Sequence, residues 1–478
     1  MWRKASRLAA VAALPCFVFA CGSGGSPDDP AGVAGTAGTT SGGGASNQAG
    51  GAGQPAMTGG SGGTTSTTAG AGGTLAGGAG SGGAGAGGTA GGAGAGGVPG
   101  NPYAADAAFC DEQLTLAAVH YAGVIATYTD PTNVPRSVKD GVVSYVNRDD
   151  WTAGFIAANL WLVYEHTADE GVRAAAETWT EALYDQRLRT NTHDLGFKLM
   201  NTYGNGLRLT GNAGYEEVLL TAAQSLSTRF DPDVGCTRSW DHGTWTFPVI
   251  VDNMMNLELL FRATELGGDT QFADIALTHA DTTMANHFHE SGQSYHVVDY
   301  NPDTGAVIAK VTHQGLSDES FWSRGQAWGL YGYTASYRES QEQRFLDHAL
   351  KIAEFYTKHA LMPEDGIPWF DNDTLERDDV PDLRDASAAA VAASGLLELA
   401  EYAEPAAGET YRAFALKTLH TLSSAEYRAA LGTNGHFLLM HSVGHYPAGV
   451  EIDAAINYAD YYYLEALLRC TKLADIAP

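Results

Sequence analysis

DNMMNLELLFRATELGGDTQFADIALTHADTTMANHF, residues 252–288, is the stretch that decides the fold. Apolar residues recur at helical spacing on both sides of Gly267-Gly268, and this glycine pair interrupts the pattern. The stretch therefore predicts two helices, 252–267 and 269–288, joined by a short turn.

The same pattern recurs from Ala107 onward and predicts ten further helices, separated by turns containing Gly, Asn, Asp or Pro. Their spans are 107–128, 151–167, 170–188, 194–209, 212–229, 319–338, 342–361, 385–403, 408–424 and 454–471. Twelve helices in hairpins predict an all-α fold, an (α/α)6 toroid of six helical pairs. A superhelical array of helix pairs is the alternative, but no consensus of fixed period repeats. Strand-like sequence is confined to 294–311, which predicts a small β-hairpin insertion.

The first hundred residues differ from the rest in composition. Residues 22–100 hold 33 of the 59 glycines in the 478-residue chain, and their only charged residues are Asp28 and Asp29. Such a segment cannot bury enough apolar surface to offset its chain entropy. We therefore expect a disordered linker at 22–100 and one folded domain at 101–478.

A short export signal precedes the linker. Arg3, Lys4 and Arg7 stand before an apolar run that ends at Ala20, the order found in secretory signals. The segment 18–22, VFACG, resembles a bacterial lipobox, which implies a lipoprotein signal peptide at 1–21 and lipidation of Cys21. We expect an exported lipoprotein of the cell envelope that reaches a membrane only through this lipid. An ordinary signal peptide cleaved near Ala20 is the alternative.

Charge and cysteine content limit the partners. Residues 101–478 contain 24 Lys and Arg against 53 Asp and Glu. Such a surface repels nucleic-acid phosphates, so we expect no nucleic-acid partner. Cys110, Cys236 and Cys470 are odd in number and lack CxxC spacing, which disfavours a zinc site. One disulfide could form among them, but the sequence leaves the pairing open, as it does the oligomeric state.

Two acidic motifs stand at predicted helix starts, His193-Asp194 and Asp252-Asn253. Each acid alone is most often a helix cap. Together they could form the carboxyl pair that glycoside hydrolysis uses. In a third motif, DDWTAGF at 149–155, Asp150 is expected to cap a helix, while Trp151 could either stack on a sugar ring or pack in the core.

The run HQGLSDESFWSRGQAW, 313–328, combines an aromatic platform, Trp322, with the fork-shaped cation of Arg324. This pairing suits a sugar carboxylate. The alternative is a helix start capped by Ser317 and Asp318. Other polar groups receive plainer interpretations: His287 and His289 lack a third ligand at fixed spacing, so no metal is expected, and the acidic run 371–385 is expected to be a solvated loop.

These segments, with DASAAAVAASGLLELA (385–400) and YADYYYLEALLR (458–469), resemble the unsaturated glucuronyl hydrolases of glycoside hydrolase family 88. The resemblance extends from Asp106 to about Arg469. The motif SRGQAW at 323–328 favours this family over the related unsaturated rhamnogalacturonyl hydrolases, which usually read RGNGW there.

The resemblance implies a toroidal enzyme, without a cofactor, that removes a 4,5-unsaturated uronic acid from the non-reducing end of oligosaccharides by hydrating the double bond. It implies that Asp252 is the general acid and base and Asp194 the second essential carboxylate. The implied substrate contacts are Trp151, His193, His296, Gln314, Trp322, Arg324, Trp328 and either Trp240 or Trp245. The alternatives are an unsaturated rhamnogalacturonyl hydrolase and a glycan-binding lipoprotein without activity.

The loop 441–451 matches a stretch that, in family members accepting sulfated fragments, tends to carry Ser and Lys. Here it retains Ser442 but contains no Lys or Arg. We therefore expect unsulfated substrates to be preferred.

Overall fold

The computed structural model describes residues 101–372 and 379–476. The predicted signal peptide, Cys21 and the linker at 22–100 lie outside the described residues. Within the part that is described, no helix combines the length and the apolar character needed to cross a membrane.

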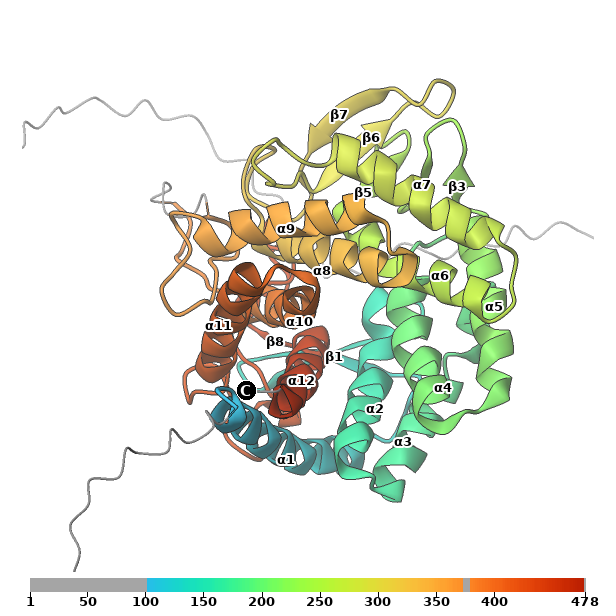
Figure 1. The fold of residues 1–478 in the computed structure, drawn as a ribbon. Helices are drawn as coiled ribbons and strands as arrows, with labels where there is room; N and C mark the ends of the chain where they lie inside the picture. Colours follow the sequence, from blue (N-terminus) through green and yellow to red (C-terminus); the bar gives the residue numbers. More distant parts are fainter. Residues whose placement is uncertain (1–100, 373–378, 477–478) are drawn as a thin grey trace, which may run out of the picture. The chain divides into compact units, whose positions relative to one another are not determined.

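Among the described residues, one set of helical segments forms an inner ring and a second set of helices lies outside it (Figure 1). The inner segments are α2 (Phe155–Thr167), η3 with α4 (Gly196–Gly204 and Asn205–Thr210), α6 (Leu257–Glu265), α8 (Ser323–Ser340), α10 (Ala386–Tyr402) and α12 (Asn457–Thr471). The outer helices are α1 (Ala104–Thr127), α3 (Glu170–Glu181), α5 (Ala213–Ser227), α7 (Gln271–Asn286), α9 (Gln343–Lys358) and α11 (Pro405–Leu422). The predicted (α/α)6 toroid is thereby confirmed.

Composition explains which helix lies in which ring. The inner α10 begins Ala-Ser-Ala-Ala-Ala, with Asp385 capping its first turn, and it is buried on every side against α8, α11 and α12. A helix that is apolar all round belongs in the interior. The outer α9 instead alternates a buried face that includes Phe345, Ile352 and Tyr356 with an exposed charged face.

A disulfide joins the first helix to the last. Cys110 of α1 and Cys470 of α12 are bonded across 360 residues of sequence, and their helices pack together. Cys236 is buried and carries a free thiol. The pairing that the sequence left open is therefore Cys110 with Cys470, and it closes the ring.

The described residues hold more strands than the sequence predicted. β5 (Pro248–Ile250), β6 (Val297–Tyr300) and β7 (Val307–Val311) form an antiparallel sheet that contains the expected hairpin. Two small antiparallel sheets were not predicted; they contain β1 (Val134–Lys139), β2 (Val142–Val146) and β8 (Ala455–Ile456), and β3 (Phe230–Asp231) with β4 (Cys236–Thr237). The prediction that strands are confined to 294–311 is therefore wrong.

The missed hairpin has a recognisable turn. Asp140 and Gly141 both adopt positive φ, at 51° and 77°, between Val138 and Val142. An Asp-Gly pair between apolar, β-branched residues is a strong hairpin signal, because this turn has the same twist as the strands that it joins. The alternation around it is only five or six residues long on each side, which is why the helical periodicity elsewhere obscured it.

Several short helices complete the chain. They are η1 (Trp151–Gly154), η2 (Tyr184–Leu188), η4 (Val251–Asn256), η6 (Asn434–His436) and η7 (Lys472–Asp475). The segment η3, within the predicted helix 194–209, is a π-helix. Such wider turns are uncommon and occur often at functional sites.

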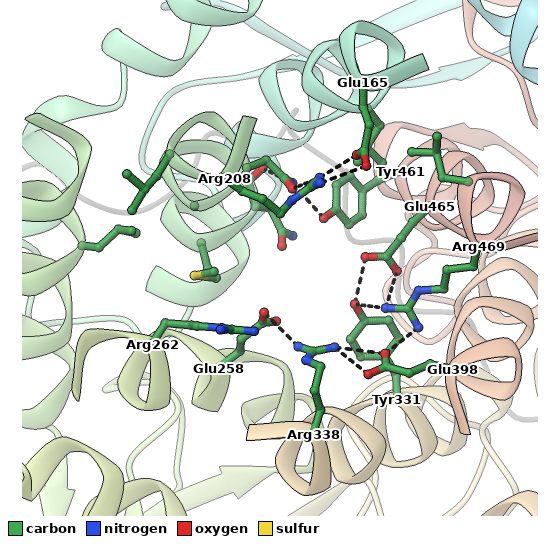
Figure 2. A pocket seen from close by; sticks show the side chains of 18 of the residues that line it. Glu165, Arg208, Glu258, Arg262, Tyr331, Arg338, Glu398, Tyr461, Glu465 and Arg469 are labelled. Atoms are coloured by element: carbon green, nitrogen blue, oxygen red, sulfur yellow. Dashed lines mark hydrogen bonds and ion pairs between the residues drawn. The ribbon is translucent and has the colours of Figure 1, made fainter. Parts of the chain in front are cut away.

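A cavity of about 520 Å³ lies toward the C-terminal ends of the inner helices (Figure 2). Arg338 contacts Glu258 and Glu398, and Arg469 contacts Glu398 and Glu465. The arginines that line it are thus ion-paired with glutamates from neighbouring helices, and none of the predicted site residues lines it. Ion pairs between neighbouring helices stabilise this end of the ring. The predicted site residues lie elsewhere, mostly near the helix starts.

Candidate active site

Most of the predicted site residues stand at or near the N-terminal ends of the inner segments, and the others, including His296 and Gln314, lie in loops. Trp151 opens η1 before α2, and Asp194 precedes η3. Asp252 lies in η4 before α6, and Trp322 precedes α8. Helix starts carry partial positive charge, which suits acidic side chains and anionic ligands.

Asp252 is a buried carboxyl group with 8% of its surface exposed. Burial raises the pKa of Asp252 to about 7, and the charge of Asp194 acts in the same direction, whereas Arg324 opposes it. Its Oδ2 atom has no hydrogen-bond partner within the described protein. Below about pH 7, Asp252 therefore retains a proton that it can give to a ligand.

His296 faces this carboxyl group as a neutral donor. Its Nδ1 accepts hydrogen bonds from the backbone N–H groups of His313 and Gln314, both at 3.1 Å. The ring proton must then be on Nε2, which lies 3.7 Å from Asp252 Oδ2. Burial, with smaller contributions from neighbouring cations and histidines, lowers the pKa of His296 well below its ordinary value. Nε2 also lacks a protein partner among the described residues, so two orphan polar atoms face the same space.

Asp194 is the second acid. Its Oδ1 lies 3.3 Å from His193 Nε2, and its Oδ2 accepts a hydrogen bond from the Thr192 hydroxyl at 2.8 Å. Burial lowers the pKa of His193, and Arg229 adds to this effect while Asp194 opposes it. Neither contact of Asp194 is a cation at neutral pH, so this carboxylate can supply negative charge beside Asp252.

Two of the predicted aromatic contacts, the half-buried Trp151 and the buried Trp322, pack against other rings of the site. Trp151 is half-buried and contacts Phe197 and Tyr458. Trp322 packs against His296 with ring centroids 4.3 Å apart. Flat aromatic faces of this kind can stack on sugar rings.

Of the two alternative tryptophans, Trp240 lies nearer the site. Its ring is 5.4 Å from that of His313, whose backbone holds His296, whereas the ring of Trp245 contacts that of Trp240, at 6.2 Å. Trp328 is fully buried and packs on Phe197 and Tyr462. Its indole packs beneath these aromatic rings and is not accessible to a ligand in this structure.

Arg324 and Gln314 both hold a backbone loop. Arg324 is buried and donates to Asp385 Oδ2 at 3.1 Å and to the carbonyl groups of Val443 and Gly444. Gln314 Nε2 donates to Gly444 O at 3.0 Å. The structure therefore shows both residues anchoring the loop 441–451 next to the site, while their predicted contact with a substrate carboxylate stays a prediction.

The comparisons with known proteins agree with this geometry. Residues 129–467 match the family model Glycosyl Hydrolase Family 88. The chain belongs to this family. It is 44% identical over 346 residues to an unsaturated glucuronyl hydrolase from Formosa agariphila, covering 71% of this chain and 85% of that protein. It is 30% identical to an unsaturated chondroitin disaccharide hydrolase from Streptococcus agalactiae, covering 70% and 84% of the two chains.

Solved structures of family 88 proteins share the fold. The structure of an unsaturated glucuronyl hydrolase specific for heparin superposes with a TM-score of 0.74 at 46% identity, covering 77% of this chain and 98% of that one. An unsaturated glucuronyl hydrolase from Bacillus sp. GL1 gives a TM-score of 0.70 at 29% identity, covering 75% and 96%. This family 88 protein is therefore a glycoside hydrolase with the fold predicted from its sequence.

Several residues of this family 88 site were not predicted individually. Asp385 pairs with Arg324 and also caps α10, and Arg324 lies over the ring of Tyr458 at 5.5 Å. Asp371 accepts hydrogen bonds from Leu316 and Ser320. Because Asp371 and Asp385 are both fully buried, the prediction that 371–385 is a solvated loop is wrong at its two ends. Asp385 and Tyr458 could have been identified from the sequence, because each is the first residue of a segment that resembles family 88, 385–400 and 458–469.

Of the expected helix caps, Asp150 is confirmed, whereas Ser317 and Asp318 are not. Asp150 accepts a hydrogen bond from Thr152 N and caps η1 as predicted. Helix α8 begins at Ser323, so Ser317 and Asp318 do not cap it. Asp318 instead accepts from Thr312 N at 2.9 Å. His287 donates from Nε2 to the Val249 carbonyl, a structural role.

Proposed function

We propose that the protein removes a 4,5-unsaturated uronic acid from the non-reducing end of glycosaminoglycan-derived oligosaccharides by adding water across the ring double bond. One observation carries the proposal: Asp252 is a buried carboxyl group with an unpartnered oxygen, beside His296, and burial raises the pKa of this carboxyl group to about 7. Hydration of a vinyl ether needs such a proton donor; displacement at C1 could use the same acid and carboxylate pair, and the similarity to an unsaturated glucuronyl hydrolase favours hydration.

The reaction starts with a proton from Asp252 to C4 of the unsaturated ring. The double-bond electrons form the new C4–H bond and leave an oxocarbenium ion between C5 and the ring oxygen. The nearby Asp194 carboxylate stabilises this positive charge. Asp252, now ionised, takes a proton from water as the water oxygen bonds to C5. The resulting hemiketal opens and releases the remaining sugar as an alcohol, so one water molecule is consumed.

Other side chains hold the ring. The half-buried Trp151 is suited to stack on one face of the ring, and His296 Nε2–H is suited to donate to a hydroxyl group. Trp322 is buried against His296 and Arg324. Arg324 supplies positive charge close to Asp252, which favours a substrate that carries a carboxylate. Two relatives bear names that refer to heparin and to chondroitin disaccharides, and this supports glycosaminoglycan fragments as the substrate class.

Heavy water tests the chemistry. Hydration places deuterium at C4 of the product and removes the ultraviolet absorbance of the double bond. Lyase-generated disaccharides are incubated in heavy water, and the product is analysed by NMR. A product that lacks deuterium at C4, or one that retains the double bond, refutes hydration; unchanged absorbance with measurable binding favours the glycan-binding alternative.

We also propose that the enzyme is exported and tethered to the cell envelope through lipid on Cys21. The order of basic residues, apolar run and Cys in the first 21 residues supports this, and the Gly-rich linker provides a spacer. The variant Cys21→Ser should move from the membrane fraction to the soluble fraction, whereas Cys16→Ser, its matched control, should stay with the membrane. Equal fractionation of the two variants would show that Cys21 is incidental.

A further inference from the structure

Lys198 is a buried cation close to the acids. Its side chain is fully inaccessible to solvent, with an exposed fraction of 0%. It lies in η3 one turn after Asp194, and its backbone N–H donates to the Asp194 carbonyl at 3.1 Å. Burying a charged ammonium group is costly unless opposite charge and hydrogen bonds compensate it.

The hydrogen bonds of Lys198 reach two other segments. Its Nζ donates to Gln186 Oε1 at 2.8 Å and to the backbone carbonyl of Asp149 at 3.2 Å. Asp149 lies two residues before Trp151, in the turn that leads into η1. Lys198 therefore links the helix that follows Asp194 to the turn that precedes Trp151. Both acceptors are uncharged, so neither compensates the positive charge.

Three carboxylates act on this cation, and two of them already have arginine partners. Asp149 lies 2.5 Å from Arg189, and Asp150 lies 2.8 Å from Arg136. Asp194 contacts Thr192 and the neutral His193, and it is the carboxylate that acts most strongly on Lys198. The charge of Asp194 is thus the one left for Lys198 to compensate.

We propose that Lys198 is a positioning residue for the hydrolysis: its ammonium group stabilises the Asp194 carboxylate and holds the turn that carries Trp151. The inference depends on the proposed function in one respect: that function requires Asp194 to be an anion during turnover. The proposed interaction between the two charges belongs to the folded protein and can be measured without substrate.

The charge of Lys198 is present over the range in which the enzyme should work. Burial lowers the pKa of Lys198 to about 8; Asp194, Asp149 and Asp150 oppose this effect, and Arg189 adds to it. Lys198 is therefore protonated below about pH 8, where Asp252 also retains its proton for part of the range.

The kinetic test compares Lys198→Met with Gln186→Leu, its matched control. Lys198→Met removes the charge, so we expect kcat/KM to fall at least about tenfold at pH 6 and the acidic limb of its pH profile to move up by about half a pH unit or more. Gln186→Leu removes one hydrogen bond and keeps the charge, so its acidic limb should stay with that of the wild type. Lys198→Arg keeps the positive charge, so it should return the acidic limb of the pH profile to its wild-type position. An unshifted limb in Lys198→Met overturns the proposal.

A second measurement is independent of activity. The unfolding free energies of Lys198→Met, Asp194→Asn and the double variant form a double-mutant cycle. If the two charges compensate each other, the double variant is more stable than the two single losses together predict. If the losses in unfolding free energy are additive, the proposed interaction between the two charges is refuted, whatever substrate the enzyme uses. Lys198→Gln replaces Lys198→Met if the latter does not fold.

Discussion

Replacing Asp252 by asparagine should abolish turnover and stabilise the protein at the same time. Burial raises the pKa of Asp252 from 3.8 to about 7. Between these two pH values the folded chain keeps a proton that the unfolded chain has lost. The stability of the wild type therefore falls as pH rises from about 4 to 7, and this contribution stays constant above pH 7.

A difference of one in pKa corresponds to about 1.4 kcal/mol, so the destabilisation by Asp252 reaches about 4 kcal/mol at pH 7 and above. Asparagine has nearly the same shape and no charge to bury. The gain in stability of Asp252→Asn over the wild type should thus be near zero at pH 4 and grow to about 4 kcal/mol by pH 7. Turnover should fall at least about a hundredfold, because asparagine cannot give a proton to C4.

The assay is urea unfolding of both proteins at pH 4, 5, 6, 7 and 8, followed by circular dichroism. Turnover is measured on the same samples by the loss of ultraviolet absorbance. In the wild type, kcat/KM should decline above about pH 7, where Asp252 loses its proton. If the unfolding free energies of the two proteins run parallel across the pH series, Asp252 is ionised in the folded enzyme and cannot be the proton donor.

Three further predictions concern the second acid, the disulfide and selectivity. Asp194→Asn should lower turnover at least about a hundredfold with an unchanged circular dichroism spectrum; near-normal turnover would remove Asp194 from the mechanism. Cys110→Ser should lower the unfolding free energy by roughly 2–5 kcal/mol, and dithiothreitol should destabilise the wild type but not the variant. The loop 441–451 contains no Lys or Arg, so kcat/KM should be higher for unsulfated than for sulfated chondroitin disaccharides, and a clear preference for sulfate would contradict the role given to this loop.

The helical architecture could be predicted because most of its elements are long and strongly periodic. The hairpin helices 252–267 and 269–288 correspond to η4 with α6 and to α7, within a few residues at each end. The short strands β1, β3, β4 and β8 have between two and six residues, too few for an alternating pattern to stand out. Their pairing depends on chain segments brought together by the ring, as when β8 joins β1.

The site was predicted as a set of residues, but not as a set of contacts. Asp194, Asp252 and His296 come from separate helix starts and loops, and only the closed ring brings them together. The spacing of residues in the sequence could not show that Arg324 donates hydrogen bonds to Asp385 and to carbonyl groups of the loop 441–451. It gave no signal for Lys198 either, because a single lysine in an apolar helix carries no motif.

Because α1 and α12 close the ring, the ends of the domain lie close together and could be moved by circular permutation. The Cys110–Cys470 bond and the hydrogen bond from Asn101 to Leu473 O hold the two ends of the domain side by side. A short peptide could join residue 101 to residue 476, and new ends could be cut at the exposed Gly211-Asn212 turn between α4 and α5. This turn follows the end of an inner helix, away from the helix starts that carry the acids. A circular permutant opened there would keep the reaction centre intact while presenting its termini on the opposite side, where a second enzyme, such as the lyase that supplies the substrate, could be fused.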